Sequence, residues 1–225
     1  MWIELVEHFA LSNLTKEEDK LIAMSGLARE FRPLIQSRYF AGLWESNIVQ
    51  ELGWVVGAWK TTRPSKYRAP SWSWASVDGF TFNRSWYANL LYGHNCSPLI
   101  EVKEAHVDLV TSDEVGQVRG GYLRVQGHLM PLEVSGQYVG VVADDRRIQS
   151  VTVQGQETKL ELRADTDEPC DMVNKIHCLP LQVCAASCTL DTLALVAVDK
   201  ENAIYRRIRF ANWSGQGAGL SLIHI

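Results

Sequence analysis

The chain has 225 residues, a formal net charge of −4 and a sequence pI of about 5.9. Its 46% apolar and 21% charged residues are ordinary for a globular protein with a buried core. This acidic balance gives no electrostatic attraction to nucleic acid or to an anionic membrane, and no apolar run approaches the roughly 20 residues of a membrane span. We therefore expect neither a nucleic acid nor a membrane as a partner.

The first residues and the cysteines both point to the cytoplasm. Residues 1–12, MWIELVEHFALS, carry two glutamates where a signal peptide would need a basic start and an apolar middle. The five cysteines are an odd number, which in the absence of an export signal favours reduced thiols over a disulfide framework.

Helical spacing of apolar residues predicts two helices at the start of the chain. The stripe of the first consists of Trp2, Leu5, Val6 and Phe9. The second should begin with a capping box between Thr15 and Glu18, with Asp19 in its first turn, and should end at Pro33. Its stripe consists of Leu21, Met24, Ala28 and Phe31.

A third helix is predicted after residue 45. The apolar residues at helical spacing are Ile48, Leu52, Val55 and Trp59. Either Ser46 or Asn47 would serve as its N-cap.

From Pro70 onward the period of the pattern changes to two. YRAPSWSWASVDG, residues 67–79, predicts a strand that starts at Pro70 and carries Trp72 and Trp74 on one face. We expect that face to be buried against the helical part. YLRVQGHLM at 122–130 and SVTVQGQETKLELRAD at 150–165 predict further strands.

The last predicted strands form a hairpin. TLALVAV at 192–198 is apolar on both faces, which is typical of a central strand. DKEN then turns the chain into AIYRRIRF at 203–210, where Arg207 alternates with the apolar Ile208 and so falls on the polar face.

Helices first and strands later predict an α+β protein, in which an N-terminal helical subdomain packs on a mainly antiparallel β-rich C-terminal part. The boundaries that follow are 1–60 for the helical subdomain, 61–69 for a connecting segment and 70–213 for the β-rich region. Residues 214–225 should be a disordered tail, because glycine-rich polar sequence cannot offset its ordering entropy.

The sequence contains no catalytic signature: it lacks a P-loop, a G-x-S-x-G elbow, an H-E-x-x-H pair and a Cys-x-x-Cys pair. The nearest approach to a metal site consists of His177, Cys178, Cys184 and Cys188. Cysteines on a strand are more often small core residues, and only CAASC offers a close pair. We therefore expect no catalytic residue, no metal site and no cofactor. His128 should lie at the surface.

The eight tryptophans allow two interpretations. Their rings could form an exposed platform that stacks on sugars or bases. Alternatively, they could join the helical part to the sheet, with the small Ser71 and Ser73 allowing a close approach of backbone. We favour the structural interpretation.

Four motifs occur in a fixed order: LTKEEDKLIAMSGLA, YFAGLWESNIVQELGW, YRAPSWSWASVDG and LALVAVDKENAIYRRI. This order resembles the region downstream of the HET (heterokaryon incompatibility) domain in large fungal proteins, and the resemblance covers almost the whole chain. One departure is Phe40, where a leucine is frequent in that family. The motif residues that we take to be structurally important are Thr15, Asp19, Gly42, Trp44, Pro70, Trp72, Trp74, Tyr205 and Arg206.

The resemblance implies a role in fungal non-self recognition and in the programmed cell death that it triggers. It implies a non-catalytic accessory region whose partners are the upstream HET domain, thought to be related to TIR folds, and other proteins. Any enzyme activity would belong to that domain, which this sequence lacks. An aromatic-platform module that binds carbohydrate is the alternative function.

Both ends of the sequence are interpreted as truncations of a gene model. The missing HET domain implies that Met1 is an internal methionine of a longer protein. LSLIHI, residues 220–225, resembles the in-frame translation of a transposase mosaic-end adapter used in sequencing libraries.

Overall fold

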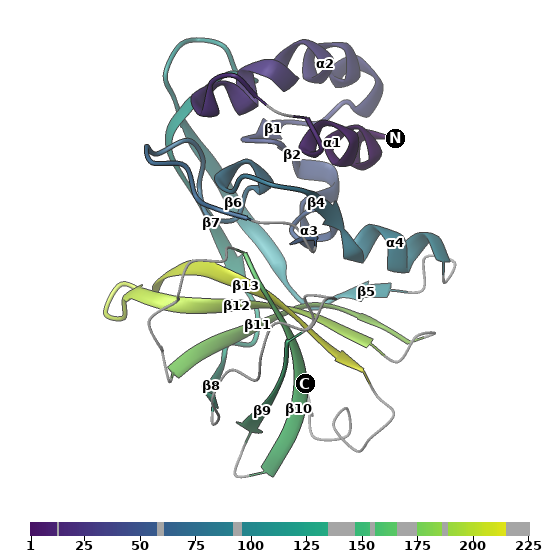
Figure 1. Ribbon diagram of the computed structural model, residues 1–225, viewed down its shortest axis with the longest axis vertical. Coiled ribbons are helices and arrows are strands. Elements are labelled where there is room, and N and C mark those ends of the chain that lie inside the picture. The colour runs from purple at the N-terminus through teal and green to yellow at the C-terminus, as the bar shows by residue number, and fades with distance from the viewer. Residues whose placement is uncertain are drawn as a thin grey trace.

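The computed structural model describes residues 1–12, 14–57, 61–91, 96–134, 147–153, 156–165, 175–185 and 189–214. Helices gather at one end of the molecule and a large sheet forms the other end (Figure 1). The expected α+β class, with N-terminal helices and a mainly antiparallel β-rich C-terminal part, is confirmed. Most of the expected tail, residues 215–225, lies outside the described residues.

The helical end contains short elements as well as helices. Its elements are α1 (Trp2–Ala10), η1 (Glu17–Asp19), α2 (Lys20–Ile35), β1 (Tyr39–Phe40), β2 (Leu43–Trp44), η2 (Glu45–Asn47), α3 (Ile48–Glu51), β3 (Trp54–Val56), η3 (Trp74–Ser76), β4 (Thr81–Asn83) and α4 (Arg84–Leu91). β3 pairs with β4 in an antiparallel two-stranded sheet.

The first two helices bury the expected stripes, but their ends differ from the prediction. Thr15 is exposed and forms no capping box, because the short helix η1 precedes α2 and Asp19 becomes the N-cap residue of α2, without a side-chain hydrogen bond. Pro33 does not end α2. It lies within the last turn, where a missing N–H costs one hydrogen bond, and the helix ends at the left-handed Gln36 (φ 53°).

The predicted third helix is wrong beyond its first turn. α3 ends at Glu51, and Val55 belongs to strand β3. Apart from the half-buried Val49, the apolar residues of both α3 and β3 are buried, so their helical spacing did not indicate a continuous helix. Trp59 lies outside the described residues.

The predicted strand at Pro70 is also wrong. Ser71 and Trp72 lie in a turn, and η3 follows directly. Ser73 is the N-cap residue of η3, and its Oγ accepts the Ala75 N–H at 3.0 Å. The local hydroxyl therefore stabilises a turn in place of an extended strand. The expected burial of Trp72 and Trp74 is confirmed, with exposed fractions of 9% and 3%.

The C-terminal end is a closed antiparallel sheet. Its strands are β5 (Cys96–Pro98), β8 (Met130–Val134), β9 (Arg147–Val153), β10 (Gln156–Ala164), β11 (Lys175–Cys184), β12 (Thr189–Asp199) and β13 (Ile204–Ser214). The pairing order is β12-β13-β10-β9-β8-β11-β5, and β12 also pairs with β11. Six strands thus form a ring, and β5 pairs with the C-terminal end of β11, beyond the residues of β11 that pair with β8.

β12 is buried on both faces, as its continuous apolar sequence predicted. Leu190, Ala194 and Val196 pack with Ile176 and Trp213 in one apolar cluster. The alternate residues Leu193 and Leu195 belong to the other cluster, which includes the core of the helical end. The sheet therefore has an apolar inner face and an apolar face that packs against the helices. The predicted hairpin of β12 with β13 is confirmed.

A long hairpin runs beside both parts of the molecule (Figure 1). It consists of β6 (Glu101–Leu109) and β7 (Val118–Gln126). Leu123 and Val125 are half-buried and alternate with exposed neighbours, as predicted, and His128 is exposed.

Candidate functional site

The motif around Gly42 forms a tight hairpin turn. β1 and β2 pair with Tyr39 opposite Trp44, and the two residues between the strands have positive φ angles, 44° at Ala41 and 103° at Gly42. Positive φ at both positions defines a type I′ turn, which favours glycine. A Cβ at Gly42 would also lie 2.5 Å from Nε1 of Trp74, so this position has no room for a larger residue.

Two indoles converge on the Gly42 carbonyl. Nε1 of Trp2 donates to it at 3.2 Å and Nε1 of Trp74 at 3.1 Å. Ser73 Oγ donates to the neighbouring Ala41 carbonyl at 2.5 Å. Residues from α1, from the β1–β2 turn and from η3 are thus joined through one stretch of backbone.

Two buried basic side chains complete this group. Lys20 Nζ lies 5.3 Å from the centre of the Trp74 ring and donates to the Val77 carbonyl at 2.6 Å. Arg68 donates to the carbonyls of Ala75 and Val77 and forms an ion pair with Asp78 at 2.7 Å. We call the whole group the Trp74 assembly: Trp2, Lys20, Gly42, Arg68, Ser73 and Trp74.

The electrostatics of Lys20 follow from this burial. Desolvation, together with the smaller effect of the Arg68 charge, lowers the pKa of Lys20 from 10.5 to about 7, against the opposing effect of Asp78. Its amine lies beneath a tryptophan ring with 4% of the residue exposed. The arrangement suits a structural hydrogen bond.

A second buried group joins the helical end to the closed sheet. Arg207 donates to both carboxylate oxygens of Asp165, at 3.1 and 3.2 Å, and to the carbonyls of Leu52 and Trp54, at 2.7 and 2.5 Å. Its guanidinium lies 3.5 Å from the centre of the Trp54 ring. Burial lowers the pKa of Arg207, while Asp165 opposes that shift. The Arg207 N–H also donates to Ser71 Oγ at 3.2 Å, which links the third and fourth motifs.

The expected place of Arg207 on a polar face is wrong. A register shift opposite Ala194 and Leu195 interrupts the alternation along β13. Arg207 and Ile208 are therefore both buried, at 2% and 9% exposure, whereas Arg206 is exposed. Sequence reasoning selected Arg206 and missed the adjacent arginine. Only the unusual RR pair next to apolar residues could have drawn attention to it.

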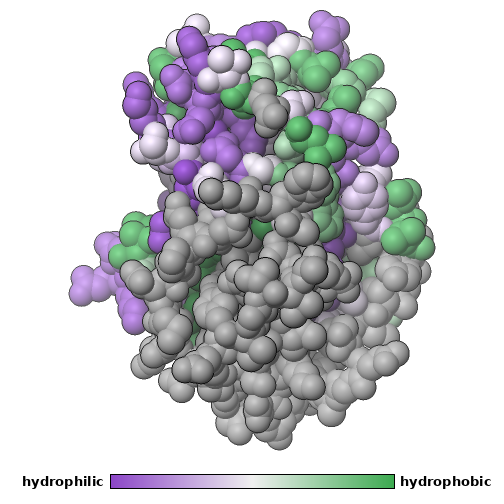
Figure 2. All heavy atoms as spheres, viewed as in Figure 1, coloured by the Kyte–Doolittle hydropathy of each residue, from purple (hydrophilic) through white to green (hydrophobic). Residues whose placement is uncertain are grey.

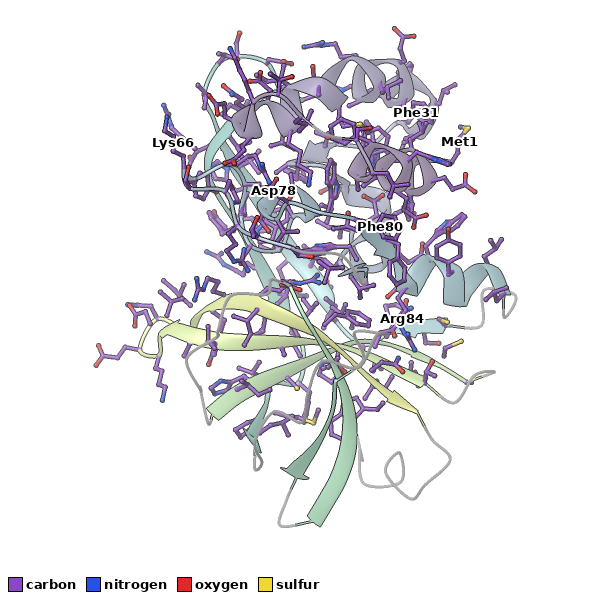
Figure 3. All side chains as sticks on the ribbon, viewed as in Figure 1. Met1, Phe31, Lys66, Asp78, Phe80 and Arg84 are labelled. Carbon is purple, nitrogen blue, oxygen red and sulfur yellow. The ribbon has the colours of Figure 1, made fainter. Side chains whose placement is uncertain are left out.

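Further polar contacts cross the same boundary. Figure 3 shows Arg84 between the helical end and the sheet, where it donates to Asn212 at 3.1 Å. Asp191 accepts hydrogen bonds from Ser85 at 2.8 Å, from Gln182 at 2.9 Å and from Asn212 at 2.9 Å.

A narrow pocket lies beside the Trp74 assembly. It has a volume of about 20 Å³, room for one water molecule, and its lining includes Glu7, Glu51 and Asn83. Burial raises the pKa of Glu51 from 4.5 to about 8, although the Trp44 N–H donates to its carboxylate at 2.9 Å. Glu51 is thus largely protonated at neutral pH. The pocket is too small for a sugar or a nucleotide.

The sequence-selected residues lie in different environments. Gly42 and Trp74 belong to the Trp74 assembly. Trp44 packs against Trp2 with ring centres 5.5 Å apart, and the Trp72 carbonyl accepts the indole N–H of Trp54 at 2.8 Å. Pro70 is buried, Asp19 and Tyr205 are half-buried, and Thr15 and Arg206 are exposed.

Within the described ranges, no group of three or more histidine, cysteine, aspartate or glutamate side chains could hold a metal ion. Of the weighed metal ligands, Cys178 is buried and His177 is half-buried, and Cys188 lies outside those ranges. In the same part of the chain, no helix has both the length and the apolar character needed to cross a membrane.

The outer face of α2 is apolar and exposed. Ile22, Leu27 and Leu34 have exposed fractions of 44%, 42% and 70%. Ala23 and Gly26 are exposed between them, and Glu30 carries a charge within this surface. Figure 2 shows hydrophobic residues at the surface of the helical end. We call Ile22, Ala23, Gly26, Leu27 and Leu34 the α2 outer face.

Comparisons of the chain with protein-family models, with curated proteins and with solved structures find no match.

Proposed function

We propose that this chain is a non-catalytic accessory region of a HET-type protein. In this proposal it lies downstream of the HET domain in the cytoplasm and acts in fungal non-self recognition and the associated programmed cell death. It does so by protein–protein interaction or by regulating the HET domain. The resemblance of the four ordered motifs is the basis for naming the partner.

The role of the motif residues supports a non-catalytic region. Gly42, Ser73 and Trp74 hold backbone segments together, and Arg207 joins the last motif to the rest. The side chains of Ser73, Trp74 and Arg207 are buried, and each donates a hydrogen bond to a backbone carbonyl. A structural role therefore explains these motif residues, and no catalytic role is needed to account for them.

The observation that carries the binding role is the α2 outer face. A helix in a monomeric protein normally presents polar residues to water, whereas α2 presents three large apolar side chains with exposed fractions of 42% to 70%. Exposed apolar groups that cluster on one element mark surfaces for protein contact. We propose the HET domain as the occupant of this face.

The motif at residues 67–79 does not support the alternative function of carbohydrate binding. A stacking platform needs exposed ring faces, and Trp72 and Trp74 are both buried. We therefore propose no carbohydrate function.

The first test concerns the family. Sequencing the genomic locus upstream of the Met1 codon should reveal a reading frame for a HET domain. A locus without one contradicts the proposed family.

The second test concerns the surface. The HET domain from that locus should bind the purified chain, and Leu27→Glu or Leu34→Glu should weaken binding by at least tenfold in a calorimetric titration. Val198→Glu is the matched control, because Val198 is 65% exposed but belongs to β12. Equal binding by all variants would assign the contact to another surface.

A further inference from the structure

Cys96 and Cys184 face each other across two antiparallel strands. Cys96 opens β5, Cys184 closes β11, and the register places them directly opposite. The Leu99 N–H donates to the Leu181 carbonyl at 2.8 Å, which makes these two residues a hydrogen-bonded pair. Because hydrogen-bonded and non-hydrogen-bonded pairs alternate along an antiparallel ladder, Cys96 and Cys184 form a non-hydrogen-bonded pair.

This type of pair suits a disulfide. The Cα atoms of a non-hydrogen-bonded pair are about 4.5 Å apart and their side chains are the closer of the two types. Disulfides accept Cα separations of about 4.4–6.8 Å. Both residues are thiols in the structure, and a hydrogen bond joins their side chains. The strands therefore need little movement to allow an S–S bond.

The two thiols differ in access to solvent. Cys96 is half-buried, whereas Cys184 is 2% exposed. A reagent in solution can reach Cys96 first, and Cys184 can then react with the sulfur of Cys96 from within the protein.

We propose that Cys96 and Cys184 form a reversible disulfide by exchange with a small-molecule disulfide such as glutathione disulfide. The Cys96 thiol loses its proton to water and its sulfur attacks the reagent, which forms a mixed disulfide and releases one glutathione thiolate. The Cys184 thiol then loses its proton, attacks the Cys96 sulfur and releases the second glutathione. The protein loses two electrons and two protons, and glutathione disulfide is reduced to two thiols.

The environment sets the rate of this exchange. Burial, followed by the hydrogen bond with Cys184 and by the electrostatic effects of Cys184 and Asp191, raises the pKa of Cys96 from 9.0 to about 12. The thiolate is the attacking species, so exchange should be slow at neutral pH and about tenfold faster for each added pH unit. The disulfide would then form during prolonged exposure to an oxidant such as glutathione disulfide, and brief exposure would leave both thiols reduced.

The bond would fix β5 at the boundary between the two parts of the molecule. Within the described residues, β5 pairs with β11 at three positions, and it follows α4 in the chain. Ser85 of α4 in turn donates to Asp191 of β12. A covalent link at Cys96 therefore adds a second connection beside an existing polar contact.

The experiment uses the full chain, reduced and then incubated with glutathione disulfide under nitrogen. We expect two thiols to be lost, and tandem mass spectrometry of a non-reduced digest should find the Cys96 peptide bound to Cys184. The oxidised protein should have a Tm about 5 °C or more above that of the reduced protein, and dithiothreitol should reverse both changes.

Variants separate this pair from the other cysteines. Cys96→Ser should abolish the loss of two thiols, whereas Cys178→Ser should preserve it, because Cys178 is fully buried on β11. A stable mixed disulfide on Cys96 of the wild-type chain, or a bond between Cys184 and Cys188, would overturn the proposal. Neither outcome bears on the HET-domain proposal, which depends on α2.

Discussion

At Gly42 two independent constraints exclude a side chain. The positive φ of 103° disfavours any residue with a Cβ, and that Cβ would lie 2.5 Å from Trp74 Nε1. Gly42→Ala should therefore lower the free energy of unfolding by at least about 2 kcal/mol, measured by urea denaturation.

Gly26 provides the matched control for this substitution. It lies in α2, and a Cβ there would meet nothing within 4 Å. Gly26→Ala should raise stability by about 0.5–1 kcal/mol, because alanine favours the helix. If Gly42→Ala raised the free energy of unfolding as Gly26→Ala does, the turn would be shown to tolerate alanine.

Glu51 makes stability depend on pH. Its pKa is raised from 4.5 to about 8 by burial, so the folded state holds a proton that the unfolded state has released. The stabilisation is complete below the unfolded pKa and is lost as the pH rises through the folded pKa. Stability of the wild-type chain should therefore fall between about pH 5 and about pH 7, below the range in which Lys20 titrates.

Glu51→Gln should remove this dependence. Glutamine has the shape of the protonated carboxyl group and still accepts the Trp44 N–H. Chemical denaturation at a series of pH values should give a flatter profile for the variant. The control is Glu30→Gln on the exposed side of α2, which should keep the wild-type slope. A wild-type slope in Glu51→Gln would assign the dependence to other groups.

At the scale of single elements, η3 depends on one hydroxyl. Ser73 Oγ accepts the Ala75 N–H and donates to the Ala41 carbonyl. Ser73→Ala removes both bonds and should cost about 1–3 kcal/mol of unfolding free energy in thermal or urea denaturation. Ser76 is the control, since its buried Oγ has no hydrogen-bond partner within the described part of the chain. Ser76→Ala should cost much less.

The sequence correctly predicted those helices and strands whose pattern of buried residues stays the same along the element. α1 and α2 have one buried stripe each, and β12 is buried on both faces from Leu190 to Val196, so the sequence patterns predicted all three elements. The 71–76 segment was not, because alternation of serine and tryptophan fits both a strand and a capped turn. Its actual form depends on contacts with Ala41 and Gly42, some thirty residues away in the chain.

The candidate site was predictable only in part for the same reason. Gly42 and Trp74 were selected by their motifs, but nothing in either motif shows that one accepts a hydrogen bond from the other. Arg207 was assigned to the wrong face because a register shift in β13 cannot be read from a strict period of two. Segments that are far apart in the chain meet at the Gly42 carbonyl only in the folded protein, so this contact could not be predicted from a local sequence pattern.

At the scale of the whole molecule, Arg207 couples the helical end to the closed sheet. Arg207→Leu leaves Asp165 as an unpaired buried charge and frees two buried carbonyls. We expect a loss of about 3–5 kcal/mol, measured by urea denaturation. Tryptophan fluorescence and circular dichroism should cease to report one common transition if the two parts then unfold separately.

Arg206→Leu is the natural control, because the two arginines are adjacent on β13 and Arg206 is exposed. Its effect should remain within about 0.5 kcal/mol. A similar loss in both variants would mean that charge on the strand, and not the buried contacts of Arg207, matters.

Closure of the sheet bears on solubility at high concentration. Each of the six strands of the ring has a neighbour on both sides along at least part of its length, and β12 pairs with β11 over residues 189–195 and with β13 over residues 189–199. Open sheets present rows of unpaired amides and tend to join edge to edge and aggregate. The ring removes that hazard from the apolar β12 and leaves the helices to present the exposed apolar surface. The exposed apolar side chains of α2 therefore lie on a helix, whose backbone amides are bonded within the helix, and not on an open edge of the apolar strand β12.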